Sequence, residues 1–387
     1  LQQLASSTPD LQCRTYYLNL GFSNKNKKSL VKKGDLIVAR HGDNGSAIVY
    51  EKDFFAQVLN AVVIEPNHEK MSPYLLKIFL ESPFVRKQIK GSVKGSVQGV
   101  INTKHVADLL IPLFSDLDYN YIENLIVSID QKIEINNRIN AELEAMTKTL
   151  YDYWFVQFDF PADSPQGQGK PYKSSGGKMV YNPILKREIP EGWSDGTLED
   201  LGQIVGGSTP STQNPENFTT EGTPWITPND LSNNQANKFI SRGGQDVSTE
   251  GIKNASLKKY PVGTVLLSSR APIGYMAISR NEVTTNQGFK SFIPNKGYTT
   301  EFIYYTVKNS LKAITQYASG STFKEVSGGV LKTVKVVLPS VAMSDAFTEK
   351  VKSIFSQQDS IERENAELTK LRDWLLPMLM NGQVTVK

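Results

Sequence analysis

Polar side chains that can read the edges of DNA bases gather in the predicted turns of the second half of the chain. Ser269 and Arg270 precede one turn, and Asn286 and Gln287 lie in another. Asn or Gln pairs bidentately with adenine in the major groove, and Arg pairs with guanine. Each residue alone is a weak indicator, because such side chains populate every kind of turn. The candidate contacts in this half are Ser208, Thr209, Asn229, Ser269, Arg270, Asn286, Gln287, Ser321 and Lys324.

Lysines and arginines stand beside glycines in the first half of the chain. A basic run at residues 25–33 precedes a predicted strand at residues 36–39, and the turn after it, residues 40–45, contains two glycines. A solvated hairpin explains this pattern, and so does a loop that tracks DNA phosphates. A second basic stretch surrounds the glycine-rich residues 91–99, which we expect to form a flexible loop. The candidate contacts here are Arg40, His41, Lys90, Lys94 and Lys104.

The chain carries no recognisable catalytic motif. HExxH, CxxC, GxSxG and the phosphate-binding P-loop are all absent from the sequence, which has three histidines and one cysteine. An adenine methyltransferase needs an Asn-Pro-Pro-aromatic loop, and residues 182–185, Asn-Pro-Ile-Leu, lack the second proline and the aromatic. We therefore expect no catalytic residue, no metal and no cofactor of the chain's own.

A long helix must position these loops. Residues 121–155 contain no proline or glycine, and Ile122, Ile126 and Ile129 follow heptad spacing. A second apolar series starts at Ile139, one register later. About 35 residues rising roughly 1.5 Å each would form a rod of about 50 Å. The predicted seam and partner-binding residues of this helix and its C-terminal counterpart are Ile139, Leu143, Met146, Leu150, Trp154, Leu368, Leu371 and Leu375.

The sequence also contains an internal repeat. A shift of 225 residues places residues 140–143 on the identical residues 365–368, and Ile122 and Ile126 on Phe347 and Val351. Each repeat is thus a globular part followed by a long helix. Asn140 and Asn365 fall in the frame of the seam, where a polar residue can fix the register, although a solvated edge position fits them equally well.

We therefore predict an α+β protein with a pseudo-twofold internal repeat. Two globular mixed α/β domains are held apart by two long antiparallel helices that form a coiled coil. Antiparallel packing places the domains at opposite ends, so that the helices act as a spacer. The predicted segments are a first domain at 1–115 that lacks the N-terminal stretch of the second, a central helix at 116–158, a proline-rich linker at 159–190, a second domain at 191–340 and a distal helix at 341–387.

Composition and charge set limits on the environment and partners. No run of 18 apolar residues and no signal-peptide pattern occurs, so the cytoplasm is the expected compartment and no membrane is expected. The net charge of +4 permits nucleic acid without indicating it. Residues 1–115 carry 15 basic and 9 acidic residues, whereas residues 116–158 carry 3 and 8. The first globular part is therefore basic and its helix acidic.

Several motifs together resemble one known family. The run at residues 140–146, continued by Leu-Tyr-Asp-Tyr-Trp-Phe at 150–155 and Phe-Asp-Phe-Pro at 158–161, is similar to the central region of specificity subunits of type I restriction-modification systems. Residues 189–193, 207–210 and 269–274 resemble the start and the loops of a target recognition domain, and residues 371–379 resemble the distal helix. The resemblance covers essentially the whole chain.

This resemblance implies a non-catalytic DNA-recognition subunit. Each target recognition domain would read one half of a bipartite site in double-stranded DNA, and the helices would set the spacing and dock two methyltransferase subunits. S-adenosylmethionine and ATP would bind only to partner subunits. These partners would include a restriction (motor nuclease) subunit. Two alternatives stay open: a coiled-coil adaptor that binds only protein, and a nuclease or methyltransferase with unrecognised active residues. The basic glycine-rich loops argue against the first alternative, and the absent motifs argue against the second.

Overall fold

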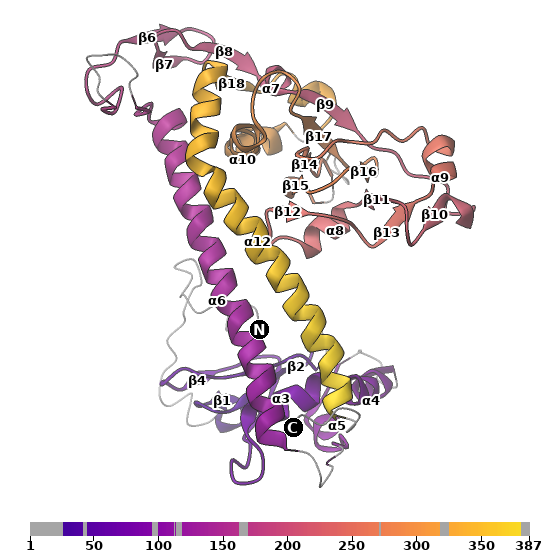
Figure 1. The fold of residues 1–387 in the computed structure, drawn as a ribbon. Coiled ribbons are helices and arrows are strands. Elements are labelled where there is room, and N and C mark those ends of the chain that lie inside the picture. Colours follow the sequence, from indigo (N-terminus) through magenta and orange to yellow (C-terminus); the bar gives the residue numbers. More distant parts are fainter. Residues whose placement is uncertain are drawn as a thin grey trace. The chain divides into compact units, whose positions relative to one another are not determined.

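The computed structural model describes residues 26–41, 45–94, 100–111, 113, 118–161, 169–270, 272–317 and 325–380. The candidate contacts Ser321 and Lys324 lie outside these residues, and so does the side chain of Lys94. The chain forms two compact units, each with its own core (Figure 1). Unit 1 comprises Leu1–Glu134 and Ala366–Lys387, and unit 2 comprises Ile135–Asn365. Each of the two long helices therefore contributes to both units.

Unit 1 is built on a small antiparallel sheet covered by helices. Its central strand β2 (Leu36–Ala39) is buried along its whole length between β3 (Ala47–Val49) and β5 (Ala61–Ile64). Leu36 and Val38 pack toward the helices, whereas Ile37 packs on the opposite face. The remaining elements are η1 (Lys27–Ser29), the two-stranded sheet of β1 (Leu30–Val31) and β4 (Ala56–Gln57), α3 (Pro73–Glu81), α4 (Pro83–Lys94) and α5 (Thr103–Ala107).

Unit 2 contains a larger version of this arrangement. A five-stranded sheet has the order β12-β15-β14-β17-β9, and a four-stranded sheet has the order β10-β13-β11-β16. The five strands of the first sheet are β9 (Gln203–Gly206), β12 (Phe239–Ile240), β14 (Val265–Leu267), β15 (Met276–Ser279) and β17 (Lys290–Ile293). The four strands of the second are β10 (Phe218–Thr219), β11 (Thr223–Ile226), β13 (Gln245–Val247) and β16 (Thr284–Thr285).

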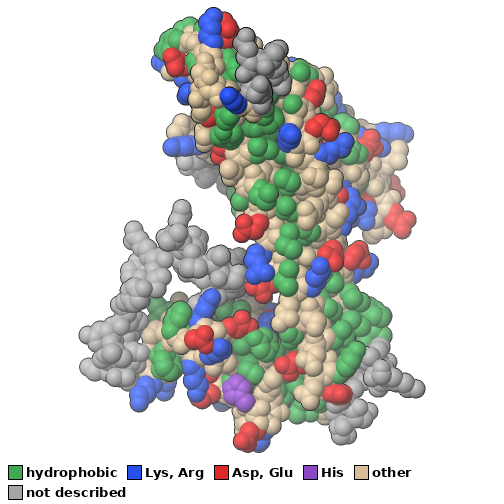
Figure 2. Space-filling view, turned by 60° about the vertical axis from the view of Figure 1, so that its left-hand side comes forward, with side chains coloured by type: hydrophobic (Ala, Val, Ile, Leu, Met, Phe, Trp, Pro, Cys, Tyr) green, Lys and Arg blue, Asp and Glu red, His purple; other side chains and the backbone are tan. Residues whose placement is uncertain are grey.

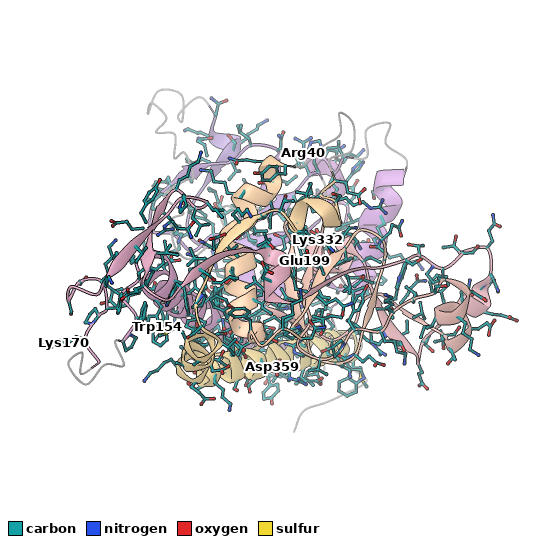
Figure 3. All side chains as sticks on the ribbon, turned by 90° about the horizontal axis from the view of Figure 1, so that it is seen from above. Arg40, Trp154, Lys170, Glu199, Lys332 and Asp359 are labelled. Carbon is teal, nitrogen blue, oxygen red and sulfur yellow. The ribbon has the colours of Figure 1, made fainter. Side chains whose placement is uncertain are left out.

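Short helices and one longer helix complete unit 2. Helix α10 (Thr300–Gln316) buries Phe302, Tyr305 and Ile314 against the core. Glu199 and Lys332 form an ion pair of 2.6 Å that ties α7 to the residue following α11 (Figure 3). The other elements are β8 (Ser194–Thr197) paired with β18 (Lys335–Leu338), α7 (Leu198–Leu201), η3 (Pro215–Asn217), α8 (Pro228–Asn233), α9 (Thr249–Asn254) and α11 (Gly328–Leu331).

The internal repeat predicted from the sequence is visible in the backbone of both units. The turn before the central strand contains Gly34 in unit 1 and Gly263 in unit 2, with φ of 90° and 81°, a region that favours glycine. The N–H of Gly34 donates to the carbonyl of Tyr50, just beyond the paired strand β3, over 2.8 Å. The N–H of Gly263 donates to the carbonyl of Ser279, at the end of the paired strand β15, over 2.9 Å. The two units therefore share one strand-turn architecture, and the two-domain design with mixed helix and strand content is confirmed.

The long helices are α6 (Tyr119–Tyr151), which continues as the π-helical turn η2 (Asp152–Val156), and α12 (Val341–Met380). In unit 1, Ile122 and Ile126 at the start of α6 share a core with Leu379 at the end of α12. In unit 2, Phe347 at the start of α12 packs on Trp154 at the end of the other helix. Within each unit the two segments therefore run in opposite directions.

The repeat extends to the junction between each globular part and its long helix. Ser72, the N-cap of α3, donates its hydroxyl to the carboxylate of Glu123 over 2.5 Å. Thr299, the N-cap of α10, accepts from the hydroxyl of Thr348 over 2.7 Å. Glu123 and Thr348 are 225 residues apart, so corresponding positions of the long helices contact the N-cap side chain in both units, with the direction of the hydrogen bond reversed.

The buried face of α6 differs from the predicted seam. Ile139 is 36% exposed and Met146 is 58% exposed, whereas Asn136, Asn140 and Thr147 are buried. The buried face thus keeps one heptad frame from Ile122 onward, and the predicted change of register is wrong. An apolar pattern could not reveal this, because polar residues occupy the buried positions. Leu143, Leu150, Leu368 and Leu375 are half-buried, Trp154 is buried, and Leu371 is exposed.

Hydrogen bonds explain how polar residues occupy this face in unit 2. Asn136 donates its amide to Oδ1 of Asn365 over 2.9 Å and to the carboxylate of Glu364 over 2.7 Å. Asn365 in turn donates to Oδ1 of Asn137 over 2.8 Å. A polar group that is buried with its partner satisfied costs little and fixes the register of the helices. Asn365 therefore joins the two helix segments of unit 2 by hydrogen bonds, whereas the buried Oδ1 of Asn140 has no partner among the described residues.

The described part of the predicted linker is folded. Strands β6 (Met179–Asn182) and β7 (Arg187–Pro190) form an antiparallel hairpin. Phe160 stacks between Tyr172 and Trp193, with ring centroids 4.7 Å and 4.9 Å away. Pro161 and Pro171 pair in an isolated β-bridge and Pro190 ends β7, so the described part of this segment is packed.

Candidate nucleic-acid interface

Three chain segments of unit 2 meet at one edge of the four-stranded sheet. Strand β16 runs parallel to β11, with Ile226 opposite Thr285, so both strands end at this edge. Strand β13 runs antiparallel to β11, with Trp225 opposite Gln245, so it begins there. The loops that follow Ile226 and Thr285, and the loop that precedes Gln245, therefore lie side by side. This edge holds several of the residues predicted to read bases, and we call it the loop edge.

The loop after β16 carries Asn286 and Gln287. The backbone N–H of Asn286 donates to the carbonyl of Ile226 over 3.0 Å, which holds the loop against the end of β11. Its side-chain Oδ1 accepts from the N–H of Gly288 over 2.9 Å. The amide nitrogen of Asn286 makes no hydrogen bond within the described part of the chain, and Gln287 is exposed. The loop thus presents amide groups toward solvent from a fixed backbone.

The loop that contains Ser208 and Thr209 lies against this one. The N–H of Ser208 donates to the carbonyl of Thr285 over 3.0 Å, and its own carbonyl accepts from the indole of Trp225 over 3.1 Å. The hydroxyl of Thr209 donates to the side-chain oxygen of Gln287. The approach is so close that a β-carbon on Gly207 would lie 2.1 Å from the carbonyl oxygen of Thr285. Glycine is therefore required here for steric reasons.

Ser269 and Arg270 join the same cluster from the five-stranded sheet. The N–H of Ser269 donates to the carbonyl of Gly288 over 2.8 Å. A β-carbon on Gly288 would lie 2.9 Å from Cγ of Pro228 and 3.4 Å from Nε of Arg270, so both side chains lie close to Gly288. Arg270 is partly exposed, and its guanidinium forms no ion pair within the described residues. Ser269 is buried, which makes it a poor candidate for direct base contact.

Helix α8 brings Asn229 to the loop edge. Thr227 caps this helix, and Asp230 accepts from the backbone N–H of Thr227 over 2.7 Å, which completes a capping box. Asn229 lies between them and is exposed. The sequence analysis missed Asp230, although the spacing Thr-x-x-Asp is a recognised helix-start signal. Asp230 also accepts from the N–H of Gly244 over 2.9 Å, which fixes the loop before β13 to the helix.

The candidate contacts of unit 1 are less closely grouped. The guanidinium Nε of Arg40 donates to the carbonyl of Ile101 over 2.9 Å, so part of this side chain supports the fold. His41 is exposed just beyond β2. Lys90 lies on α4, which continues through Gly91 to Lys94, so the loop predicted to start at residue 91 is helical at its beginning. Lys104 is exposed on α5. No described contact joins these four residues into one cluster.

A buried charge network holds the globular part of unit 2 to the long helices. The ammonium of Lys238 lies 2.7 Å from the carboxylate of Glu144 on α6 and 2.6 Å from the amide oxygen of Gln358 on α12. Arg280 pairs with Glu362 over 2.7 Å. Burial lowers the pKa of Lys238 to about 8 against the attraction of Glu144, so Lys238 remains protonated at neutral pH. The network orients the domain relative to the helix segments of the same unit.

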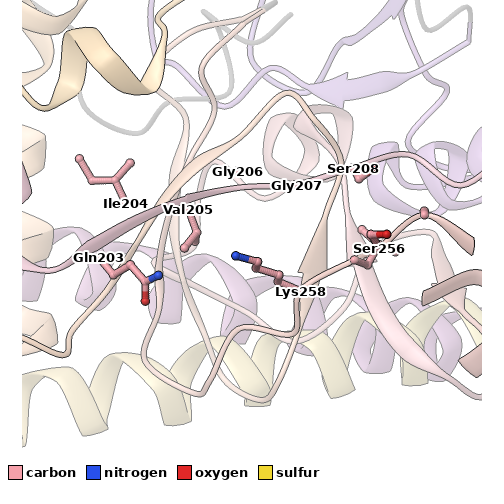
Figure 4. A pocket seen from close by; sticks show the side chains of 10 residues that line it. Gln203, Ile204, Val205, Gly206, Gly207, Ser208, Ser256 and Lys258 are labelled. Carbon is pink, nitrogen blue, oxygen red and sulfur yellow. The ribbon is translucent and has the colours of Figure 1, made fainter. Parts of the chain in front are cut away.

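A shallow pocket lies beside the loop edge. Its volume is about 390 Å³, and it is lined by residues 203–208 of β9 and the following loop and by residues 255–258 (Figure 4). Figure 4 shows the Lys258 side chain pointing toward β9. Lys258 is exposed and makes no ion pair with any described residue. The pocket thus places one exposed cation, Lys258, beside the loop that carries Ser208.

Neither a metal centre nor a membrane span is found in the parts of the chain that the structure describes. No group of three or more His, Cys, Asp or Glu side chains there could hold a metal ion. No helix among those residues is long and apolar enough to cross a membrane. The two units thus share one architecture built on paired helix segments, and unit 2 gathers polar loops at one sheet edge.

Comparisons with known proteins identify the family of this chain. The profile of the type I restriction modification DNA specificity domain matches residues 10–145 and residues 190–370. The chain is 38% identical over 200 residues to the type I restriction enzyme MjaIX specificity subunit of Methanocaldococcus jannaschii, a match that covers 49% of this chain and 45% of that protein. It is 28% identical over 408 residues to the type I restriction enzyme HindI specificity subunit of Haemophilus influenzae, covering 92% and 88%.

A solved structure shares the fold. The S subunit of a type-I restriction-modification system from M. genitalium aligns over 90% of this chain and 83% of its own, with 16% sequence identity and a TM-score of 0.51. Because the family profile matches most of the chain, this protein belongs to the family of type I restriction modification DNA specificity domains. The predicted resemblance is confirmed, and the family is one of specificity subunits rather than catalytic ones. The match with the MjaIX subunit spans less than half of that protein's length.

Proposed function

We propose that this chain is the DNA-reading subunit of a type I restriction-modification enzyme. Each globular unit contacts one half of a bipartite site in double-stranded DNA, and the long helices set the distance between the halves. The chain itself performs no chemistry and carries no cofactor. S-adenosylmethionine and ATP act on partner subunits, and the assembly works in the cytoplasm.

The convergence of loops at the loop edge is the observation that carries this proposal. Asn229, Arg270, Asn286 and Gln287 come from three separate segments, yet backbone hydrogen bonds and close glycine contacts hold them together. The free amide of Asn286 suits adenine, and the guanidinium of Arg270 suits guanine or a phosphate. Side chains fixed on a rigid sheet edge lose little conformational entropy on binding, so they can discriminate between bases.

Exposed apolar side chains on the long helices support the docking of partner proteins. Ile135, Ile139 and Met146 are 44%, 36% and 58% exposed on α6, and Leu371 and Trp374 are 43% and 58% exposed on α12. Figure 2 shows apolar side chains on the surface along these helices. Exposed apolar patches of this kind mark protein interfaces. We assign them to two methyltransferase (modification) subunits, which a restriction subunit joins in the complete enzyme.

A selection on duplex DNA tests the proposal. The chain, purified with its modification subunits, is incubated with duplexes that contain two randomised blocks and a spacer of variable length. The bound fraction should contain two short conserved half-sites at one fixed separation. Binding without sequence preference would contradict the proposal and favour the protein-only adaptor. Cleavage or methylation by the homogeneous chain alone would favour an unrecognised enzyme.

A pair of substitutions at Asn286 assigns one half-site to unit 2. Asn286→Asp keeps an oxygen that accepts from Gly288 but loses the amide donor, whereas Asn286→Ala loses both. Both variants should relax one position of a single half-site by about 1 to 3 kcal/mol, and the Asp variant should retain the wild-type folding stability more closely. Equal weakening of all duplexes by both variants would show that Asn286 only supports the loop.

A further inference from the structure

Arg242 occupies the third segment of the loop edge, where neither the sequence pattern nor the family likeness pointed to a contact. It lies in the loop that precedes β13, three residues before Gln245, which pairs with Trp225. This loop therefore lies beside the segment that connects β11 to Asn229 on α8. The side chain of Arg242 is 58% exposed. Its backbone therefore lies beside the loop edge, and its exposed side chain extends back along β13 toward Asp246.

The backbone under Arg242 is held in place. The N–H of Gly244 donates to Asp230 over 2.9 Å. A β-carbon on Gly243 would lie 2.5 Å from Oδ2 of Asp230 and 2.8 Å from the carbonyl oxygen of Trp225. No larger residue fits there without movement, so the loop lies directly against α8. The base of the Arg242 side chain therefore has a fixed position relative to the other loops.

Asp246 fixes the direction of the guanidinium. Nη2 of Arg242 lies 2.7 Å from Oδ2 of Asp246, whose side chain is 3% exposed and also accepts from the N–H of Gly222 over 3.1 Å. Nε and Nη1 of Arg242 have no hydrogen-bond partner among the described residues. One N–H of Nη2 is therefore held by a buried carboxylate, while its second N–H and a neighbouring nitrogen remain available to a ligand as a two-donor fork.

This arrangement differs from that of a cation that only follows the DNA backbone. A phosphate contact needs a positive charge on a side chain that can reach the DNA backbone, which an exposed lysine such as Lys258 supplies. Reading a base requires a planar fork held in one orientation, because two acceptors must be met at the same time. The buried carboxylate beside Arg242 provides that orientation before DNA arrives, which reduces the entropy lost on binding.

We propose that Arg242, held by Asp246, is a specificity-determining residue that reads a guanine in the half-site of unit 2. Guanine presents O6 and N7 together in the major groove, and this pair of acceptors matches the guanidinium fork. The inference rests on the proposed function and adds a guanine-reading contact from a third loop. It also predicts that the half-site of unit 2 contains at least one guanine.

The decisive comparison is between Arg242→Lys and the wild-type chain, both purified with the modification subunits. Lysine keeps the charge and the ion pair with Asp246 but cannot bind two acceptors in one plane. We expect Arg242→Lys to lose about 5- to 150-fold of the preference for guanine at one position, with the other positions unchanged. Asp246→Asn should reduce the same preference by a smaller factor, because the arginine remains but is no longer held by a charge.

Two control variants separate this inference from its alternatives. Lys258→Ala, which removes an unpaired cation beside the loop edge, should weaken all duplexes equally and leave base preference intact. Asn286→Ala should relax a different position of the same half-site. Thermal unfolding of each complex shows whether the fold is retained. The comparison uses only variants whose unfolding temperature lies within a few degrees of that of the wild type. If Arg242→Lys falls outside this range, Arg242→Gln replaces it.

The outcomes distinguish failure of the inference from failure of the proposed function. If Arg242→Lys and Arg242→Gln both bind every duplex as the wild type does while Asn286→Ala relaxes a position, Arg242 serves only to neutralise Asp246 and the inference is wrong. Uniform weakening by Arg242→Gln with no loss in Arg242→Lys would identify a phosphate contact, which also overturns it. If the wild-type complex selects no sequence, the proposed function itself fails.

Discussion

The ammonium of Lys238 lies 2.7 Å from the carboxylate of Glu144, and the side chain of Lys238 is only 3% exposed. This ion pair joins the globular part of unit 2 to its segment of α6. The ring of Phe355 on α12 lies 3.9 Å from the same ammonium, which adds a cation-π contact. The orientation of the domain on its helix segments therefore depends on a buried charge rather than on apolar contacts alone.

Removing the lysine should destabilise unit 2. Lys238→Met leaves the carboxylate of Glu144 partly buried with one cation fewer, and breaking a buried pair in this way costs about 3 kcal/mol of unfolding free energy. Urea unfolding measures the change. Lys308→Met is the matched control, because Lys308 also pairs with Glu144 but is 35% exposed, and it should cost less than about 1 kcal/mol. Equal effects of the two variants would contradict a special role for the buried pair.

The same network predicts a loss of stability in acid. Burial alone would raise the pKa of Glu144, but the charges of Lys238 and Lys308 outweigh it and lower the pKa to about 2. The unfolded chain binds the proton near pH 4.5, so the stabilisation is complete above that pH and is lost as the pH falls toward 2. Glu144 should contribute about 3 kcal/mol to this loss. The measurement is the free energy of unfolding between pH 2 and 6. If the unfolding free energy of a Glu144→Gln variant falls as steeply with decreasing pH as that of the wild type, the assignment is wrong.

Two adjacent glycines should respond differently to the same substitution. Gly207→Ala would bring a β-carbon within 2.1 Å of the carbonyl oxygen of Thr285, whereas in Gly206→Ala the nearest atom lies 3.6 Å away. The first variant should displace the loop that carries Ser208, lower the unfolding free energy by about 1 to 3 kcal/mol and relax the half-site of unit 2. The second should behave as the wild type. Binding selections and urea unfolding on both variants decide the matter, and indistinguishable variants would mean that the loop is not held at this edge.

Met146 and Leu371 should have equivalent roles in binding the modification subunits. They are 225 residues apart, and both are exposed apolar residues on the long helices. Met146→Glu and Leu371→Glu should each remove one of two modification subunits, and the double variant should remove both, because a charge in an apolar interface is costly to bury. Ala141→Glu introduces the same charge at an exposed position elsewhere on α6 and should leave the assembly intact. Light scattering of the purified complexes gives the stoichiometry, and an unchanged mass in the double variant would rule out this docking surface.

Much of the local structure could be predicted from the sequence because its signals are local. The apolar run at residues 36–39 forms β2, and the stretch at residues 121–155, which has no proline or glycine, lies within α6 and the η2 turn that continues it. The repeat was visible because equivalent positions in both halves keep the same character. Each of these features depends on a few neighbouring residues, so composition and spacing are sufficient to indicate it.

What could not be predicted depends on contacts between distant segments. Asn136 is buried on α6 although an apolar pattern gives no sign of it, and the sequence left open whether Asn140, also buried, lies in the seam or at a solvated edge. Ser269 looked like a base-reading residue but is buried behind the loop edge, while Arg242 became a candidate only because β13 begins where β11 ends. Strands β11 and β16 pair in parallel although some 60 residues separate them in the chain. No local sequence pattern indicates this pairing. Site residues were therefore identified by type, and their grouping required the fold.

The central claim is that the long helices set the spacing of a bipartite DNA site. Inserting three heptads after Glu134 and three after Asn365, at the boundaries of the compact units, preserves the heptad frame and lengthens the helices by about 32 Å. That length corresponds to about nine base pairs at roughly 3.4 Å each, close to one turn of DNA. A single inserted heptad adds about three base pairs and turns the second half-site to another face of the duplex, so this shorter variant should bind poorly at every spacing.

The decisive measurement is therefore a selection on duplexes with the two wild-type half-sites and every spacer length, carried out on the three-heptad variant bound to its modification subunits. The account predicts the same two half-sites with a spacer longer by about nine to ten base pairs. An unchanged spacer preference in a folded and assembled variant would contradict it.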